Sequence, residues 1–274
     1  MRVSVVTFLR PGSEPPGRSL DRILDYARRV EGAGFSGLWV TDSFGRGSAT
    51  LDPVVALGAL AAATRKIELG TCVLQVPVRH PVELAHRLQS LHALSHDRLR
   101  LGLGSGSTKA DFDLVGADFE QRFKTLMSSL DIMRRAWRGE ALEGGVLTPW
   151  PGTEGGPQIM LGAWRNKRWI TYAAEHCDGW IASGLYGSWE DLEAGIRRYR
   201  EAGGKRAILA NVIVDLHDRP EIAERARAAT ITLIGGADEA RRRWERIKAI
   251  GFDDVLCVSP VEALEDIERI RDFA

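Results

Sequence analysis

The sequence lacks several features that mark whole classes of protein. No apolar run approaches the roughly 20 residues that a transmembrane helix needs, so no membrane partner is expected. The chain has only three cysteines, Cys72, Cys177 and Cys257, widely separated. Such a set argues against a disulfide framework and for a reducing compartment. Lys plus Arg (37) equals Asp plus Glu (37), so a basic surface for nucleic acid is not indicated.

Motifs of the common catalytic classes are also missing. The sequence contains no G-x-S-x-G, no C-x-x-C and no H-E-x-x-H. His92 and His96 share a helical face but are expected away from the active rim, so we interpret them as structural and expect no metal. The segment LGLGSGS has Ser107 where a dinucleotide fingerprint requires its last glycine. By elimination, a bound cofactor is expected to carry the chemistry.

The bulk composition is that of an ordinary globular enzyme. The chain has 274 residues, of which 44% are hydrophobic and 27% charged, enough for one large domain. The first residues, MRVSVVTFLRPG, include a short β-like run without a following cleavage site of small residues. We interpret them as a first strand rather than a signal peptide, and we expect a cytoplasmic location.

Short apolar runs alternate with amphipathic patterns along the whole chain. The runs predict eight strands: Val3–Leu9, Gly37–Thr41, Ile67–Leu74, Leu99–Gly104, Gln158–Gly162, Gly179–Ser183, Ile208–Asp215 and Asp254–Val258. The patterns between them predict helices over 19–33, 53–64, 82–95, 119–138, 166–176, 189–202, 220–234 and 261–272, with an extra helix near 237–249. Alternating strands and helices require a parallel sheet. The predicted fold class is therefore α/β, a (β/α)8 TIM barrel, as a single domain over residues 1–274.

Turn and capping residues support these helices. Four prolines occupy expected first helical positions: Pro53, Pro81, Pro220 and Pro260. The segments Ser188–Asp191 and Ser259–Glu262 match capping boxes, and Gly34 and Gly251 follow helices. Two segments depart from the alternation. Residues 105–118 form a long predicted loop that could cover a ligand, whereas the Gly/Pro-rich 139–157 is interpreted as a connector.

In a barrel, chemistry sits where strands end and loops lead into helices. Asp42 and Ser43 follow the second strand, where the aspartate could bind a ligand or cap the loop. Glycines after the fourth strand could admit a flat ligand or form a plain tight turn. The basic run at residues 165–168 begins a helix, a position that favours anions, so we interpret it as a phosphate site rather than a solvated face.

A family resemblance becomes visible in the run ELGTCVLQVPVRHPVELAHRLQSLHALSHDRLRLGLGSGS, Glu68–Ser107. Together with GFSGLWVTDSF upstream and GGPQIMLGAWRNKRWITYAAEHCDGWIASG downstream, it resembles the bacterial luciferase-like flavin-dependent oxidoreductases. The resemblance implies a barrel that binds FMN or the deazaflavin coenzyme F-420 at its C-terminal rim, and a homodimer. It also implies a non-proline cis peptide bond at Cys72–Val73, behind the flavin ring.

The resemblance further implies a set of cofactor-binding residues. Those expected to face the flavin ring are Asp42, Thr71, Cys72 and Val73, and those expected beside it are Gly104, Ser105, Gly106 and Ser107. Those expected to hold the phosphate are Gly162, Ala163, Trp164, Arg165 and Asn166. Arg79 is expected near the phosphate or the cofactor tail.

The chain departs from the family pattern at one position. Many deazaflavin-using relatives read Asp-His-Phe where this chain has Asp42-Ser43-Phe44. Ser43 is the one catalytic candidate, but a hydroxyl is a poor acid, so the general-acid role is in question. The missing histidine slightly favours FMN over coenzyme F-420.

Two functions from different classes therefore stand. The first is a flavin-dependent oxidoreductase, of the monooxygenase type, that acts on a small organic substrate. The second is a barrel that binds a flavin without turnover, as a carrier or sensor. A metal-dependent barrel hydrolase is disfavoured, because no cluster of His and carboxylate residues is expected at the rim.

Overall fold

The computed structural model describes residues 1–8, 10, 16–47, 49–217, 219–227, 229–258 and 264–273. The chain forms two compact units. The first unit comprises Met1–Thr7, Arg29–Trp39 and Ile159–Ala274, and the second comprises Phe8–Arg28 and Val40–Gln158. Helix α1 (Pro16–Gly32) contributes to both.

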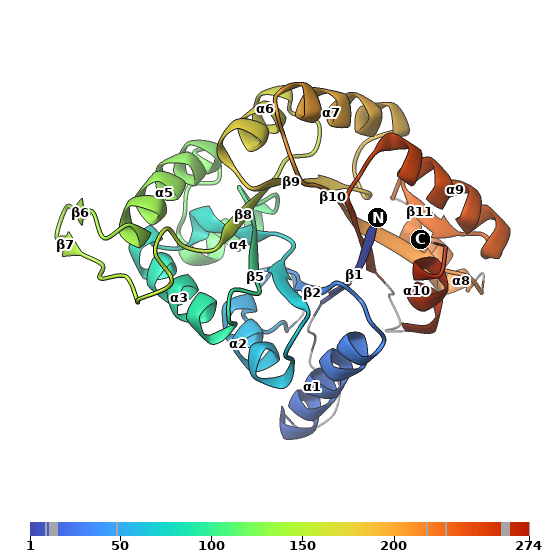
Figure 1. Cartoon of the computed structure of the whole chain (residues 1–274), viewed down its shortest axis with the longest axis horizontal. Helices are drawn as coiled ribbons and strands as arrows, with labels where there is room; N and C mark the ends of the chain where they lie inside the picture. The colour runs from blue at the N-terminus through green and yellow to red at the C-terminus, as the bar shows by residue number, and fades with distance from the viewer. Residues whose placement is uncertain are drawn as a thin grey trace. The chain divides into compact units, whose positions relative to one another are not determined.

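The first unit is built on parallel strands. Its strands are β1 (Arg2–Thr7), β2 (Gly37–Val40), β8 (Gln158–Gly162), β9 (Gly179–Ser183), β10 (Ala207–Asp215) and β12 (Asp254–Val258). The pairs β8–β9, β9–β10, β10–β12 and β12–β1 are all parallel. Because a parallel pair needs a crossover, helices lie between these strands along the chain. They are α6 (Lys167–His176), α7 (Trp189–Glu201), α8 (Pro220–Ala226), α9 (Gly236–Ile250) and α10 (Leu264–Arg271), and α6 and α7 lie along β8–β10 (Figure 1).

One helix of the first unit was predicted too long. The helix expected over 220–234 ends at Ala226, and Thr232–Ile234 forms strand β11, which pairs in parallel with Ile213–Asp215. The run Thr-Ile-Thr-Leu-Ile that precedes Gly235 is rich in β-branched residues, which fit a pleated surface better than a helix.

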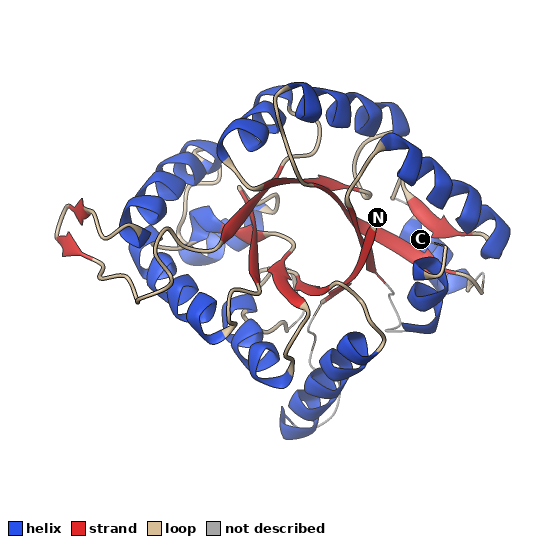
Figure 2. Ribbon diagram, viewed as in Figure 1, coloured by secondary structure: helices blue, strands red, loops and turns tan. Residues whose placement is uncertain are grey.

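The second unit has shorter strands and a compact helical cover. Its strands β3 (Glu68–Thr71), β4 (Leu74–Gln75) and β5 (Leu99–Gly104) pair in parallel, with β5 beside both others. Its helices are α2 (Pro53–Ala63), the 3-10 turn η1 (Val76–Val78), α3 (Pro81–Leu94), α4 (Lys109–Val115) and α5 (Arg122–Trp137). Figure 2 shows a two-stranded antiparallel hairpin beyond α5, β6 (Ala141–Leu142) with β7 (Gly145–Val146).

Two predictions for the second unit need correction. The strand expected over Ile67–Leu74 is divided into β3 and β4, and the division lies at a cis peptide bond between Cys72 and Val73. The loop expected over 105–118 contains helix α4. Asp111 and Phe112 are buried on α4, and Gly116 ends it in the left-handed conformation (φ 68°). Helix α4, with 7 residues, is too short for a periodic hydrophobic pattern to reveal it.

Most predicted helix ends are confirmed. Prolines lie in the first turn of α2, α3 and α8, and Ser188 and Asp191 form the expected capping box on α7. Gly251 caps α9 with φ 100°, and Gly34 follows α1 with φ 79°. The prediction at Ser259–Glu262, with Pro260, and that at Leu9 lie outside the described residues.

Each unit has an apolar core with large aromatic side chains. Trp39, Trp137, Trp180 and Trp244 are fully buried. The indole N–H of Trp180 on β9 donates to the carbonyl of Ala163 at 2.7 Å, which ties the segment after β8 to β9. Among the described residues, no helix is long and apolar enough to cross a membrane. Cys72, Cys177 and Cys257 are all present as thiols.

Two helical glycines offer a matched test of packing. A Cβ at Gly195 on α7 would lie 2.6 Å from the ring of the buried Trp180, whereas a Cβ at Gly58 on α2 would touch nothing within 4 Å. Alanine stabilises a helix interior by about 1 kcal/mol relative to glycine, but overpacking a core costs about 1–3 kcal/mol. We therefore expect Gly195→Ala to lower the free energy of unfolding and Gly58→Ala to raise it. Urea denaturation would measure both, and stabilisation by Gly195→Ala would contradict the packing at Trp180.

Candidate functional site

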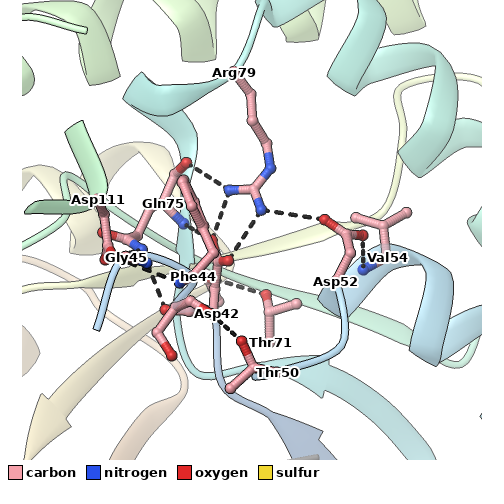
Figure 3. A network of polar contacts seen from close by, with 12 residues as sticks. Asp42, Phe44, Gly45, Thr50, Asp52, Val54, Thr71, Gln75, Arg79 and Asp111 are labelled. Carbon is pink, nitrogen blue, oxygen red and sulfur yellow. Dashed lines mark hydrogen bonds and ion pairs between the residues drawn. The ribbon is translucent and has the colours of Figure 1, made fainter. Parts of the chain in front are cut away.

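A buried ion pair lies just beyond the end of β2 (Figure 3). The Asp42 side chain is 1% exposed, and both of its oxygens accept hydrogen bonds from Arg79, at 2.6 and 3.0 Å. The backbone N–H of Gln75 donates to the same carboxylate at 2.8 Å. A buried carboxylate is tolerable only when such donors compensate for lost hydration. Asp42 is therefore held in one place by the segment that follows the cis peptide.

Arg79 contacts more than Asp42. It donates to the carbonyl of Gln75 at 3.0 Å and to the Asp52 carboxylate at 3.4 Å. Burial alone would lower the pKa of the Arg79 guanidinium, but Asp42 and Asp52 together raise that pKa above its ordinary value. Asp52 also caps α2 by accepting from the N–H groups of Val54 and Val55. Arg79 is thus permanently charged and paired with two carboxylates.

Gln75 connects this ion pair to a second buried carboxylate. Its side-chain amide donates to the carbonyl of Asp42 at 3.2 Å and to Asp111 on α4 at 2.9 Å. Asp111 also accepts from the N–H of Gly45 at 2.7 Å and from Arg46 at 2.9 and 3.1 Å. Figure 3 shows these side chains converging from the loop after β2, from β4 and from α4.

Hydrogen bonding decides the charge of Asp111. Burial on its own would raise the pKa of this carboxyl. The hydrogen bonds from Arg46, Gln75 and the Gly45 N–H outweigh burial, so the pKa of Asp111 lies below its ordinary value. The group is therefore a carboxylate at neutral pH, and the Arg46 charge stabilises it.

The segments predicted to lie against a flavin ring form an uncharged surface. Thr71 is buried and donates to the carbonyl of Gly102 at 2.7 Å, and Cys72 is buried with its N–H bonded to the carbonyl of Val40. The expected cis peptide at Cys72–Val73 is present. Val73 is partly exposed and lies over Gly104, where a Cβ would come within 2.6 Å of its methyl group. Only glycine fits at that point of β5.

The other predicted residues, in the loop after β5, differ in exposure. Ser105 and Gly106 are partly exposed and Ser107 is exposed. Gly106 has φ 81°, and a Cβ there would lie 2.8 Å from the side-chain oxygen of Gln75. Within the described residues, that buried oxygen has no hydrogen-bond partner. Ser43 is partly exposed, and its carbonyl accepts a hydrogen bond from the Thr50 hydroxyl.

The predicted phosphate segment belongs to the first unit, where it follows β8. Asn166 is the N-cap of α6 and accepts from the N–H groups of Arg168 and Trp169 at 3.1 and 3.3 Å. Arg165 lies 3.8 Å from Asp191. Its neighbours Lys167 and Arg168 are exposed, so cationic side chains gather at this helix start. Asn166 already uses two N–H groups of the helix end, which leaves mainly these side chains for an anion.

The same segment carries an exposed aromatic pair. Trp164 stacks on Tyr186, the ring centroids lying 4.3 Å apart, and both side chains are close to half exposed. Ala163 is buried and its N–H donates to the carbonyl of Ile181, while Gly162 is partly exposed. The chain thus presents aromatic and cationic groups together at the carboxyl end of β8.

Sequence reasoning missed four members of the polar network: Asp52, Arg46, Gln75 and Asp111 were not among the expected site residues. The one available signal was an aspartate directly before the apolar Phe112 in a segment taken as loop. Among the described residues, no group of three or more His, Cys, Asp or Glu side chains could hold a metal ion.

Removing one partner of the buried Asp42–Arg79 pair should destabilise the fold. Arg79→Met leaves the Asp42 carboxylate buried without its cation, so we expect the free energy of unfolding to fall by about 3–5 kcal/mol. The double variant D42N/R79M should recover part of that loss, since no unpaired charge remains. Arg87→Met, which removes an exposed partner of Glu83 on α3, should cost less than about 1 kcal/mol. Chemical denaturation at neutral pH checks this; equal losses for R79M and R87M would refute it.

The lowered pKa of Asp111 predicts an acid-dependent contribution to stability. A carboxyl with a lower pKa in the folded state stabilises the fold above its unfolded pKa, about 3.9, and this stabilisation disappears as pH falls through the folded value. The stability difference between wild type and Asp111→Asn should therefore be full at neutral pH and should shrink below about pH 4. Urea unfolding of both proteins from neutral to acid pH measures it, and a difference that stays constant would contradict the assignment.

Comparison with solved structures defines the fold. Monooxygenase RslO1 from Streptomyces bottropensis superposes with a TM-score of 0.83 at 20% identity, covering 100% of this chain and 96% of that one. An FMN complex of the oxygenating constituent of 3,6-diketocamphane monooxygenase from Pseudomonas putida gives 0.76 at 17% identity, covering 98% and 96%. An F-420-dependent secondary alcohol dehydrogenase gives 0.76 at 16%, covering 100% and 99%. The predicted α/β fold class, a (β/α)8 TIM barrel, is confirmed.

Sequence comparison gives the family. A 4-hydroxyprotoasukamycin monooxygenase from Streptomyces nodosus subsp. asukaensis is 34% identical over 143 residues, which are 51% of this chain but only 38% of that protein. A 5,10-methylenetetrahydromethanopterin reductase from Methanolobus tindarius is 29% identical over 198 residues, 70% of this chain and 58% of that protein. The profile described as luciferase-like monooxygenase matches residues 1–256, and the chain belongs to that family.

Proposed function

We propose that the chain is a flavin-dependent oxidoreductase of the luciferase-like monooxygenase type, which acts on a small organic substrate with FMN or coenzyme F-420. The observation that carries this is the uncharged surface of Val73 over Gly104, bordered by the polar network around Asp42. A flat tricyclic ring needs such an aliphatic and backbone surface on one side and fixed polar groups at its edge. The residues present fit the cofactor.

The protein's own groups would position the ring. Gly104 lacks a side chain, so the Val73 side chain can pack directly on the backbone of β5 and face a planar ligand from there. Thr71 and Cys72 are buried and tied to neighbouring strands, so that this surface is rigid. When bound, the cofactor supplies hydride transfer or oxygen activation, chemistry that side chains of this surface do not provide.

The phosphate of the cofactor is assigned to the start of α6. Gly162, Ala163, Trp164, Arg165 and Asn166 stay our prediction for this role. Support comes from the exposed cations Lys167 and Arg168 and the positive end of the helix dipole. Arg79 is a weaker candidate than the sequence indicated, because its charge is already paired with two carboxylates.

Ser43 bears on the choice of cofactor. It stands where many deazaflavin-using relatives have a histidine, and its hydroxyl can donate a hydrogen bond but cannot act as an acid near neutral pH. We keep the slight preference for FMN on this ground. The similar solved structures include both FMN and F-420 enzymes, so both stay in the test.

We further propose one domain over residues 1–274, a homodimer and a cytoplasmic location. The exposed apolar side chains Val55 on α2 (70% exposed) and Leu94 on α3 (65% exposed) support a contact between copies. Three cysteines present as thiols support a reducing compartment.

Titration with each cofactor tests the proposal. We expect FMN or F-420 to bind saturably, seen as quenching of cofactor fluorescence, and Gly104→Ala to weaken binding by about tenfold or more, or about 1.4 kcal/mol, because its Cβ displaces Val73. Gly144→Ala, whose Cβ would meet nothing within 4 Å, should bind like wild type. Binding of neither cofactor would reject the proposal.

A second measurement separates the enzyme from a non-catalytic flavin carrier or sensor. The reduced cofactor, bound to the protein, is mixed with oxygen or with candidate organic substrates. Oxidation of the bound cofactor faster than that of free cofactor identifies turnover. Tight binding without any such acceleration would favour the carrier.

A further inference from the structure

Asp111 is the most heavily hydrogen-bonded side chain of the polar network. Its side chain is fully buried, and one oxygen accepts from the N–H of Gly45 at 2.7 Å while the N–H of Phe44 lies at 3.5 Å. The other oxygen accepts from both Arg46 and the Gln75 amide. One carboxylate on α4 thus ties together the loop after β2 and strand β4, segments more than 30 residues away in the sequence.

The loop over residues 43–47 rests directly on the backbone of α4. A Cβ at Gly45 would lie 2.8 Å from the carbonyl oxygen of Ala110 and 3.0 Å from the N–H nitrogen of Asp111. No side chain separates the two segments there. The hydrogen bonds from the loop to Asp111 hold the segments in contact. Ser43, which stands where many deazaflavin-using relatives have a histidine, starts the same loop.

We propose that Asp111 is a positioning residue for the cofactor surface: it fixes the 43–47 loop, and through Gln75 it fixes Asp42 and the segment after Val73. This inference rests on the proposed flavin function. Asp111 itself is fully buried. It acts by holding Ser43 and Asp42 where the ring edge is expected.

The chemistry of the site requires a carboxylate at this position. Among the described residues, every hydrogen-bond partner of Asp111 is a donor: two N–H groups of the 43–47 loop, the Arg46 guanidinium and the Gln75 amide. Asparagine has the same shape but would turn its NH2 group against one pair of these donors in either orientation. Asp111→Asn should therefore break the hydrogen bonds to one pair of these donors without leaving a cavity.

Hydrogen exchange tests the holding of the loop without any cofactor. We expect exchange in peptides that cover residues 43–47 to be about tenfold faster in Asp111→Asn than in wild type. The N–H of Gly45 would lose its carboxylate acceptor, or the loop would lose its attachment to α4. Asp113→Asn is the matched control, since Asp113 lies on the same helix but is exposed and pairs with Lys109. Unchanged exchange of residues 43–47 in D111N would overturn the proposal.

Cofactor titration tests the consequence for binding. Whichever of FMN and F-420 binds wild type should bind D111N about tenfold more weakly, with a changed visible spectrum of the bound ring, and D113N normally. Gly195→Ala in the first unit serves as a second control, because it lowers stability without touching the network. A merely structural role would leave the affinity of the folded D111N protein and the spectrum as in wild type, and that result would overturn the proposal.

The two arms keep this inference distinct from the proposed function. If wild type binds neither cofactor, the flavin function fails, and the exchange measurement still decides whether Asp111 holds the loop. If D111N does not fold, Arg46→Gln replaces it, since it removes the partly exposed cation and leaves Asp111 bonded to Gly45 and Gln75. About threefold faster exchange at 43–47 and about threefold weaker binding are then expected, and no change in either overturns the proposal.

Discussion

The second unit is organised by the need to compensate two buried carboxylates. Asp42 and Asp111 are both almost fully withdrawn from water, and an ionised carboxylate in that position costs several kcal/mol unless donors replace its hydration. The structure meets this need with Arg79, Arg46, Gln75 and backbone N–H groups, all from two separate segments, 44–46 and 75–79. The conformations of these segments are therefore set together. Any loop of the site that moved would expose or unpair one of the two charges.

The charge balance of this network indicates what it can bind. Among the described residues, the carboxylates of Asp42, Asp52 and Asp111 pair with two guanidinium groups, those of Arg79 and Arg46, so the network has an excess of negative charge. Gln75 bridges two acceptors with its amide N–H groups, which fixes its orientation without adding charge. A phosphate would be repelled by such a group of residues. Under the proposed function, the network therefore suits the uncharged part of a ligand rather than its phosphate.

The sequence predicted what depends on local periodicity and missed what depends on distant partners. The bounds of β5, β8, β9 and β12 agree with the predicted ranges, because each is a continuous apolar run between turn residues. The cis peptide at Cys72–Val73 came from the family resemblance and not from any local signal. Helix α4 was missed because its burial depends on Asp111, whose partners Gly45 and Arg46 lie 66 and 65 residues away. No window of sequence can show that an aspartate will be surrounded by donors.

This division also explains why the sequence could suggest a candidate site but could not name its chemistry. The surface of Val73 and Gly104 is backbone and aliphatic, so under the proposed function it would suit a ring of either flavin type and select neither. In the polar network beside it, Arg79 is paired with Asp42, and Asp111 is kept ionised. Under the proposed function, the partly exposed Ser43 at the edge of the network would offer only a hydroxyl for proton transfer. A chain with this arrangement suits reactions in which the cofactor does the redox work and the substrate needs no strong protein acid.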